Sequence, residues 1–580
     1  MRLNDRYLPG LRWLEGYNRR SFSGDLLSGI TIAAMLIPQS MAYALVAGLP
    51  VEYGLYACII PPIIYALLGT SNKLSIGPVA LDSILILTGL SLLAEPGSDQ
   101  YLEMAISLTL MVGLIQAFFG FIRFGFIASF LSYPVILGYT CAAAVVITVS
   151  QFESLLGVSV EGRNTVTRLM QFVGAYESWH WLTVAVSACG IAFLWVFQRW
   201  FPKLPSALLL LIVGMLCSGI WNAQANGIEV IAFIPQGLPL PRVPSPTLEQ
   251  LVALIPTAFT VSLMGYVGSM SICKAQEKPT DKFFVKPNQE LIAMGAANFV
   301  GAFFKAFPVS ASFSRSAAFV KAGALTQVSA VVSSFMIIII VLFCTPLFAS
   351  YPLPKPLLAG IIVISVYGLF KYHDMKSLLS QNRNEAIVML VTFALTILLG
   401  VQQGLLAGVI LSIAKLIYNS ARPHMAELGA IMDGKLFRNV DRFDEVIIRE
   451  DVLIFRFDAP LFFANADYFV QSIYRWMQQR ENPDALRAVI FDAEAVNSID
   501  TTAIRAMQKL IETLSKQDVC FYITNAIGPV RDSLFNSPLK IYITPQTMFA
   551  TIHDAISYID HGVGSNDGVG VQTNLIPVGD

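Results

Sequence analysis

The chain has 580 residues, of which 55% are hydrophobic and only 13% charged, against about 25% charged in an ordinary soluble protein. A soluble fold of this composition would lack the polar side chains to cover its surface. The formal net charge of −1 leaves no basic surface for nucleic acid. The 7 Cys form no CxxC pair and the 5 His lie in polar stretches or near the C-terminus, so we expect no metal site and no cofactor.

Charged residues are unevenly distributed along the chain. Residues 421–580 carry 35 of the 77 Asp, Glu, Lys and Arg residues, in little more than a quarter of the length. We therefore expect a membrane part followed by a soluble domain. The predicted parts are a cytosolic N-terminal arm at 1–25, a transmembrane domain at 26–420, a soluble domain at 430–560 and a flexible tail at 561–580.

About fourteen apolar stretches follow one another in the membrane part, several of them shorter than the roughly 20 residues that cross a bilayer. They lie at 26–47, 54–68, 79–94, 104–122, 126–150, 182–199, 206–221, 250–272, 289–304, 312–320, 327–349, 357–370, 386–400 and 403–419. Arginines in the arm place it in the cytoplasm by the positive-inside rule. An even number of spans then returns the soluble domain to the cytoplasm.

The soluble domain shows alternating strand and helix patterns, which favour a small α/β fold. We expect strands at 446–448, 452–455, 489–491 and 519–523, and helices at 466–479 and 501–515.

Two spans are interrupted at corresponding places, seven spans apart. Leu74-Ser-Ile-Gly-Pro-Val-Ala80 opens the third span, and Pro308-Val-Ser-Ala-Ser-Phe-Ser-Arg-Ser316 opens the tenth. Each has an extended stretch followed by a short helix, with Gly or Pro near the break. In an inverted-repeat transporter, two such half-helices direct their N-termini at an anion. The Gly-Pro pair could instead simply kink a spanning helix.

Arg315 and Asp82 are charged residues inside apolar segments, where a charge costs about 2.5 kcal/mol or more. Arg315 would attract an anion, or it could pair with a carboxylate or extend to the surface. Asp82 could pair with Arg315, bind a coupling proton or cation, or cap a nearby helix.

Gln39 and Tyr43 lie one turn apart on the first span. The Gln39 amide needs a partner there, which is either a neighbouring helix or a substrate.

Several motifs resemble the SulP family, the sulfate permeases related to animal anion exchangers and to prestin. These motifs occur in order as Gln39-Ser-Met-Ala-Tyr43-Ala, Gly54-Leu-Tyr56, Gly69-Thr-Ser71, Ser75-Ile-Gly-Pro78-Val-Ala80, Asn288-Gln-Glu290-Leu, Asn298 and Ser312-Phe-Ser-Arg-Ser316. The C-terminal domain resembles the STAS module through Pro460-Leu-Phe-Phe-Ala-Asn465 and Val496-Asn-Ser-Ile-Asp500-Thr-Thr-Ala503.

This resemblance implies fourteen spans in a seven-plus-seven inverted repeat, with repeats at about 26–222 and 250–420, and with core and gate subdomains. It also implies a homodimer, and an elevator-like movement of core against gate. The substrate site it implies consists of Gln39, Tyr43, Val79, Ser312, Phe313, Ser314 and Arg315.

One position departs from the family pattern. Coupled members carry an acidic residue in the eighth span, where this chain has Gly268. We hypothesise that Asp82 supplies the coupling charge for H⁺ or Na⁺ instead. The rival hypothesis is that cation coupling is lost, which would leave exchange or uniport.

Asp500 precedes the predicted helix at 501–515 and is expected to cap it. In STAS domains of the anti-sigma-antagonist type, a Ser or Thr at the next positions can be phosphorylated. Thr501 and Thr502 occupy these positions and are the candidate regulatory residues.

We therefore expect a secondary transporter for a small inorganic anion in the cell membrane, that of a bacterial inner membrane by default. Sulfate is the first candidate and bicarbonate the second. A dicarboxylate carrier, an anion channel, an uncoupled exchanger and a voltage-responsive motor remain alternatives. A membrane enzyme would need a nucleophile–base pair or a metal cluster, for which the sequence offers no candidate.

Overall fold

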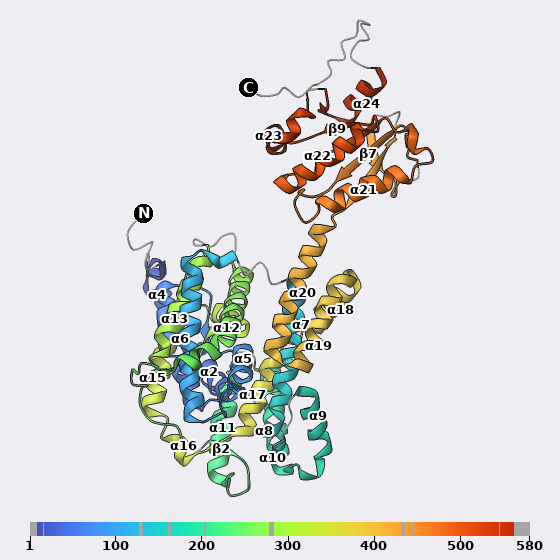
Figure 1. Cartoon of the computed structure of the whole chain (residues 1–580). Coiled ribbons are helices and arrows are strands. Elements are labelled where there is room, and N and C mark those ends of the chain that lie inside the picture. Colours follow the sequence, from blue (N-terminus) through green and yellow to red (C-terminus); the bar gives the residue numbers. More distant parts are fainter. Residues whose placement is uncertain are drawn as a thin grey trace. The chain divides into compact units, whose positions relative to one another are not determined.

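The computed structural model (Figure 1) describes residues 9–14, 17–126, 132–160, 164–201, 205–231, 233–277, 284–431, 436–443, 445–544 and 546–561. Residues 562–580 of the predicted tail and residues 1–8 of the predicted arm lie outside the described residues. The chain divides into two compact units, 1–412 and 413–580.

The first half of the membrane unit is helical wherever apolar stretches are predicted. It contains η1 (Pro9–Leu14), α2 (Arg19–Val46), α3 (Val51–Tyr56), α4 (Ile60–Leu68), β1 (Ile76–Gly77), α5 (Ala80–Leu90), α6 (Asp99–Phe121), α7 (Tyr133–Ser150), α8 (Phe152–Leu156), α9 (Thr165–Gly174), η3 (Tyr176–Ser178), α10 (Trp181–Trp200) and α11 (Ser206–Trp221). Polar caps fix several helix starts. The Asn18 side chain accepts the Ser21 N–H at the start of α2, and Ser98 accepts the Tyr101 N–H at the start of α6.

The second half repeats this pattern. It contains β2 (Val230–Ile231), α12 (Leu248–Gln276), α13 (Pro287–Ala302), β3 (Ser310–Ala311), α14 (Phe313–Lys321), α15 (Val328–Phe343), α16 (Leu347–Ser350), β4 (Leu353–Pro354), α17 (Lys355–Tyr367), α18 (Tyr372–Gln381), α19 (Arg383–Leu399) and α20 (Val401–Ala421). Each of the fourteen predicted stretches contains a helix. Within the described residues, eight helices are long and apolar enough to cross a membrane.

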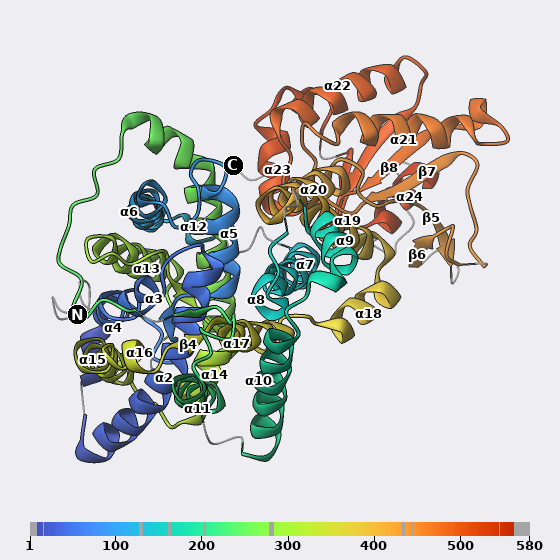
Figure 2. The same ribbon diagram turned by 90° about the horizontal axis from the view of Figure 1, so that it is seen from below.

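Helices of the membrane unit pack in two groups (Figure 2). The core group contains α2 to α6 and α12 to α15, with α6 against α13 and α2 against α15. The gate group contains α7, α10, α11, α17 and α19, with α7 against α19 and α10 against α17, and its helices α11 and α17 also pack against α2 of the core group. Glycines allow the α6–α13 backbones to approach closely, because a Cβ at Gly113 would lie only 2.4 Å from the Phe299 nitrogen.

The second unit holds a six-stranded sheet in the order β10-β9-β8-β7-β5-β6, in which β7 to β10 are parallel. Its elements are β5 (Met425–Ile431), β6 (Leu436–Asn439), β7 (Val452–Phe457), α21 (Ala466–Gln478), η4 (Pro483–Ala485), β8 (Ala488–Asp492), α22 (Thr501–Ser515), β9 (Cys520–Thr524), α23 (Gly528–Phe535), η5 (Pro538–Ile541), β10 (Met548–Phe549) and α24 (Ile552–His561). Separate apolar cores lie on the two faces of the sheet, one beneath α21 and α22 and the other beneath α24.

Two details of this unit differ from the prediction. The predicted strand at 446–448 is a single bridge, between Ile447 and Ala430. The hairpin β5–β6 is not predicted, and β5 begins at Met425, before the predicted domain start at 430. Gly429 and the polar residues of β6 weaken the alternation of apolar and polar residues that marks a strand. The hairpin therefore depends on the pairing of β5 with β7.

Candidate functional site

Two short helices of the core group, α5 and α14, begin beside one another inside the membrane unit. The strands that lead into them pair antiparallel, with Ile76 opposite Ala311 and Gly77 opposite Ser310. The helices have 11 and 9 residues, which is too short to cross a bilayer. The two interrupted spans are therefore half-helices joined through their extended parts, and neither is a kinked continuous helix.

Neither half-helix has a side-chain cap. The residues before them are extended, Val79 at φ −135° and ψ 141° and Ser312 at φ −114° and ψ 130°, and neither side chain accepts a hydrogen bond from the first turn. The Ser312 hydroxyl lies 3.2 Å from that of Ser314 instead. The first-turn N–H groups and the positive dipole ends thus remain available to an anion.

Buried side chains hold the strand β3 in place. Asn298 accepts the Val309 N–H at 2.8 Å, donates to the Val309 carbonyl at 3.2 Å, and donates to Gln116 at 3.0 Å. The Ser269 hydroxyl accepts the Ala311 N–H at 2.9 Å. Three helices, α6, α12 and α13, thereby fix the start of α14.

Arg315 is fully buried behind the two half-helix starts. Its Nη1 donates to the Pro78 carbonyl at 2.8 Å, whereas Nε and Nη2 have no hydrogen-bond partner among the described residues. The guanidinium also forms no ion pair within that part of the chain. It therefore neither extends to the surface nor pairs with Asp82, and its positive charge is not neutralised by a direct partner.

Asp82 joins the two half-helices. Its side chain is 3% exposed, and its Oδ2 accepts a short hydrogen bond from the Ser310 hydroxyl. A Cβ at Gly265 of α12 would lie 3.6 Å from this oxygen. Gly268, one turn further along α12, would place its Cβ in open space, with no atom within 4 Å.

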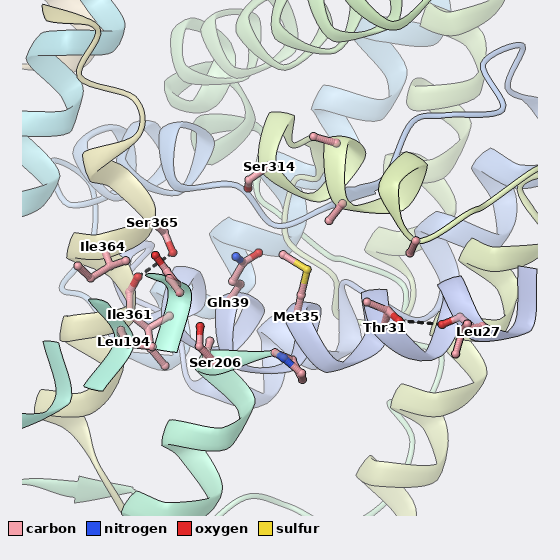
Figure 3. Close-up of a pocket in the computed structure, with 16 residues that line it drawn as sticks. Leu27, Thr31, Met35, Gln39, Leu194, Ser206, Ser314, Ile361, Ile364 and Ser365 are labelled. Carbon is pink, nitrogen blue, oxygen red and sulfur yellow. Dashed lines mark hydrogen bonds between the residues drawn. The ribbon is translucent and has the colours of Figure 1, made fainter. Parts of the chain in front are cut away.

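A cavity of about 890 Å³ lies beside the half-helix α14, between the core and gate groups. Figure 3 shows Gln39 rising from α2 toward Ser314 at the start of α14, with Ser206 on the other side of Gln39. The cavity continues along α2 to Leu27 and along α14 to Ala322. It therefore extends toward the end of the bundle at which α2 begins.

The structure separates the predicted site residues into two layers. Gln39 and Ser314 line the cavity, whereas Tyr43, Val79, Ser312 and Arg315 do not. Tyr43 is 6% exposed and lies within electrostatic reach of Arg315 and Ser365. The Phe313 side chain lies outside the described residues.

Sequence reasoning did not identify the gate side of this cavity. Its polar lining there comes from Gln198 of α10, Ser206 of α11 and Ser365 of α17. The only available signal was that Ser206 starts a short apolar helix directly after Pro205.

In the second unit, Asp500 caps α22. Its Oδ1 accepts the Ala503 N–H at 2.8 Å, and its Oδ2 accepts the Phe463 N–H at 2.8 Å. The predicted cap is confirmed. Thr501 and Thr502 are exposed on the first turn of α22, so a regulatory modification of either remains a prediction.

Comparison with known proteins adds family evidence to this geometry. Residues 22–392 match the model of the sulfate permease family, and residues 445–555 match the STAS domain. A probable sulfate transporter of Mycobacterium tuberculosis is 33% identical over 550 residues, covering 95% of this chain and 97% of that protein.

Solved structures share the fold. The murine Solute Carrier 26 family member A9 anion transporter, in its inward-facing state, matches with a TM-score of 0.86 at 25% identity, over 95% of this chain and 94% of that one. The transmembrane domain of the cyanobacterial bicarbonate transporter BicA matches with a TM-score of 0.59 at 20% identity, over 68% of this chain and 98% of that domain.

Fold and family together define a multi-pass membrane protein that transports anions and carries a C-terminal STAS domain. The chain belongs to the sulfate permease family, whose members are transporters and not enzymes.

Proposed function

We propose that this protein carries a small inorganic oxyanion across a bacterial inner membrane by secondary transport, with sulfate as the first candidate and bicarbonate as the second. The core group moves against the gate group in an elevator-like cycle, as a symporter or an exchanger. The protein works as a homodimer, with its N- and C-termini in the cytoplasm.

One observation carries this proposal: α14 begins without a cap at the cavity wall, and the uncapped start of α5 and the unneutralised guanidinium of Arg315 lie directly behind it. Each helix start contributes about half a positive charge, and Arg315 adds a full one. The site favours an anion and repels a cation. Gln39 and Ser314 line the cavity with neutral polar groups, which can orient the oxygen atoms of the anion.

The test is uptake of labelled sulfate, bicarbonate, chloride and succinate by reconstituted vesicles, with imposed proton and sodium gradients. We expect saturable sulfate or bicarbonate uptake. Arg315→Ala should lower that uptake about 10- to 100-fold, the effect of losing one interaction with a charged group.

Arg199→Ala is the matched control, because Arg199 is exposed in the last turn of α10 and does not line the cavity. It should transport like the wild type. Unchanged uptake in Arg315→Ala would contradict the proposed site, faster succinate uptake would favour a dicarboxylate carrier, and a large unsaturable chloride flux would favour a channel.

We further propose that Asp82 carries the coupling charge that family members place in the eighth span. Its carboxylate lies against Gly265 of α12, one turn from Gly268. Asp82 belongs to the first half of the core group and α12 to the second, so an acidic side chain reaches the eighth span from the other half. Gly268 leaves open space there in which an ion could be held.

Asp82→Asn should abolish the stimulation of uptake by a proton or sodium gradient but leave exchange of internal for external anion. Ser310→Ala removes the hydrogen bond to Asp82 and keeps the carboxylate, so it should remain sensitive to the gradient. If Asp82→Asn keeps its full gradient dependence, Asp82 is not the coupling group.

A further inference from the structure

The gate helix α11 begins at the wall of the cavity. It has 16 residues, which gives about 24 Å at 1.5 Å per residue, less than the roughly 30 Å of a hydrocarbon core. Its first residues, with Pro205 before them, line the cavity. The positive end of a third helix thus meets the space that α14 borders from the core side.

Within the described part of the chain, polar groups at this helix start have no hydrogen-bond partner. Pro205 occupies the capping position and offers no side-chain acceptor. The first helical hydrogen bond runs from the Leu209 N–H to the Pro205 carbonyl at 3.1 Å, so the three amides before Leu209 have no acceptor within the helix.

The Ser206 side chain is a second, separate sign of a missing ligand. It is 7% exposed, and Figure 3 places it at the cavity beside Gln39. Within the described residues, its hydroxyl forms no hydrogen bond with any protein group. The hydroxyl is accessible from the cavity and can donate to a ligand bound there.

We infer that the start of α11 is a second anion site, on the gate side of the cavity, for the same small oxyanion as the proposed core site. The inference rests on the proposed function. The amides and the Ser206 hydroxyl supply donors, and the helix dipole supplies positive potential. Among the described residues that line the cavity, none is charged, so no acidic side chain there repels a bound anion and no basic one competes for it.

Gln39 links the two sites. It lies between Ser314 and Ser206 in Figure 3, and its side-chain NH2, which can donate to an anion, forms no hydrogen bond with the described residues. The anion binds first at α11, which belongs to the gate group, and then transfers past Gln39 to α14, which belongs to the core group. Movement of the core group then carries the anion away from α11 and releases it on the other side of the membrane.

The test uses the full chain. Equilibrium binding is measured with labelled sulfate and, in parallel, with labelled chloride, and uptake of both anions is measured in vesicles. Ser206→Ala should raise the KM for uptake about tenfold and leave Vmax unchanged, as expected from the loss of one hydrogen bond to a charged group. Ser206→Asp puts a carboxylate on the free amides, a position that favours an acid. It should bind one anion fewer per chain than the wild type.

Thr31→Asp is the matched control, because it adds the same charge to the cavity wall in the middle of α2, away from any helix start. It should weaken binding but keep the wild-type number of sites.

If the wild type takes up none of the anions, the proposed function fails. Two results together would overturn only the second site in a wild type that transports. These are that Ser206→Asp binds as many anions per chain as the wild type, and that Ser206→Ala has the wild-type KM. Should Ser206→Asp fail to fold, the KM of Ser206→Ala decides.

Discussion

Asn298 shows how a single buried amide can determine the geometry of the transport site. Its side chain is fully buried, and it satisfies both the N–H and the carbonyl of Val309, the residue before β3. Gln116, 1% exposed, binds Asn298 and donates to the Ser262 carbonyl at 3.1 Å. Buried polar groups of this kind stabilise a fold only when every member has a partner.

Removing this amide should therefore destabilise the core group. We expect Asn298→Ala to lower the free energy of unfolding by about 2–4 kcal/mol, since it removes the partner of the N–H and the carbonyl of Val309 and of the side-chain oxygen of Gln116. Thermal unfolding of the purified protein in detergent measures the effect, and uptake should fall with it.

Thr109→Ala on α6 is a suitable comparison. Thr109 is also fully buried, but its hydroxyl bonds only to the Ala105 carbonyl of its own helix, at 2.7 Å. Its loss should cost about 1 kcal/mol or less. Equal shifts in the two variants would argue against a special role for Asn298.

At the scale of elements, one arginine adds polar contacts to the apolar core that holds the C-terminal helix α24 on its sheet. Arg449 donates two hydrogen bonds to Asp560 of α24, both at 2.7 Å, and also binds Asp451. The Arg449 hydrogen bonds lower the pKa of the Asp560 carboxyl below its usual range. The paired carboxylate therefore stabilises the fold above the unfolded pKa of about 3.9, and this contribution is lost as the pH falls through the folded pKa.

Arg449→Leu should loosen α24 at neutral pH. The contact is partly exposed, so we expect a loss of about 1 kcal/mol, or about fivefold faster amide exchange. Hydrogen–deuterium exchange of the full chain, read on residues 552–561, measures it. Arg475→Leu on the exposed side of α21 should leave that exchange unchanged. If acidification through the folded pKa of Asp560 left the protection factors of residues 552–561 unchanged in the wild type, with the intrinsic pH dependence of amide exchange divided out, the assigned role of Asp560 would be wrong.

The half-helices illustrate how far an element can be predicted. Pro78 and the serines around Arg315 indicate from local sequence that the third and tenth spans are interrupted, and the structure places breaks there, at 76–79 and 310–312. The pairing of β1 with β3 could not be derived in the same way. It joins residues more than 230 positions apart, and β1 and β3 have only two residues each.

At the scale of the whole molecule, two helical repeats place complementary groups in one interior. Asp82 comes from the first repeat and Ser310 from the second, and Arg315 of the second repeat binds the carbonyl of Pro78 in the first. Each half therefore lacks a complete site. The cavity likewise needs both groups, since α2 and α14 form one wall and α10, α11 and α17 the other.

Composition and periodicity by themselves determined the membrane part, the places of its fourteen spans, the two interruptions and most elements of the soluble domain. These properties depend on hydrophobicity and backbone preference, which act along the chain and are visible in a short window. Only the tertiary structure decided that Arg315 lies behind the cavity, that Asp82 binds Ser310, and that Ser206 faces Gln39. Such contacts join distant segments, and the free energy that selects them comes from packing and from the need to pair every buried polar group.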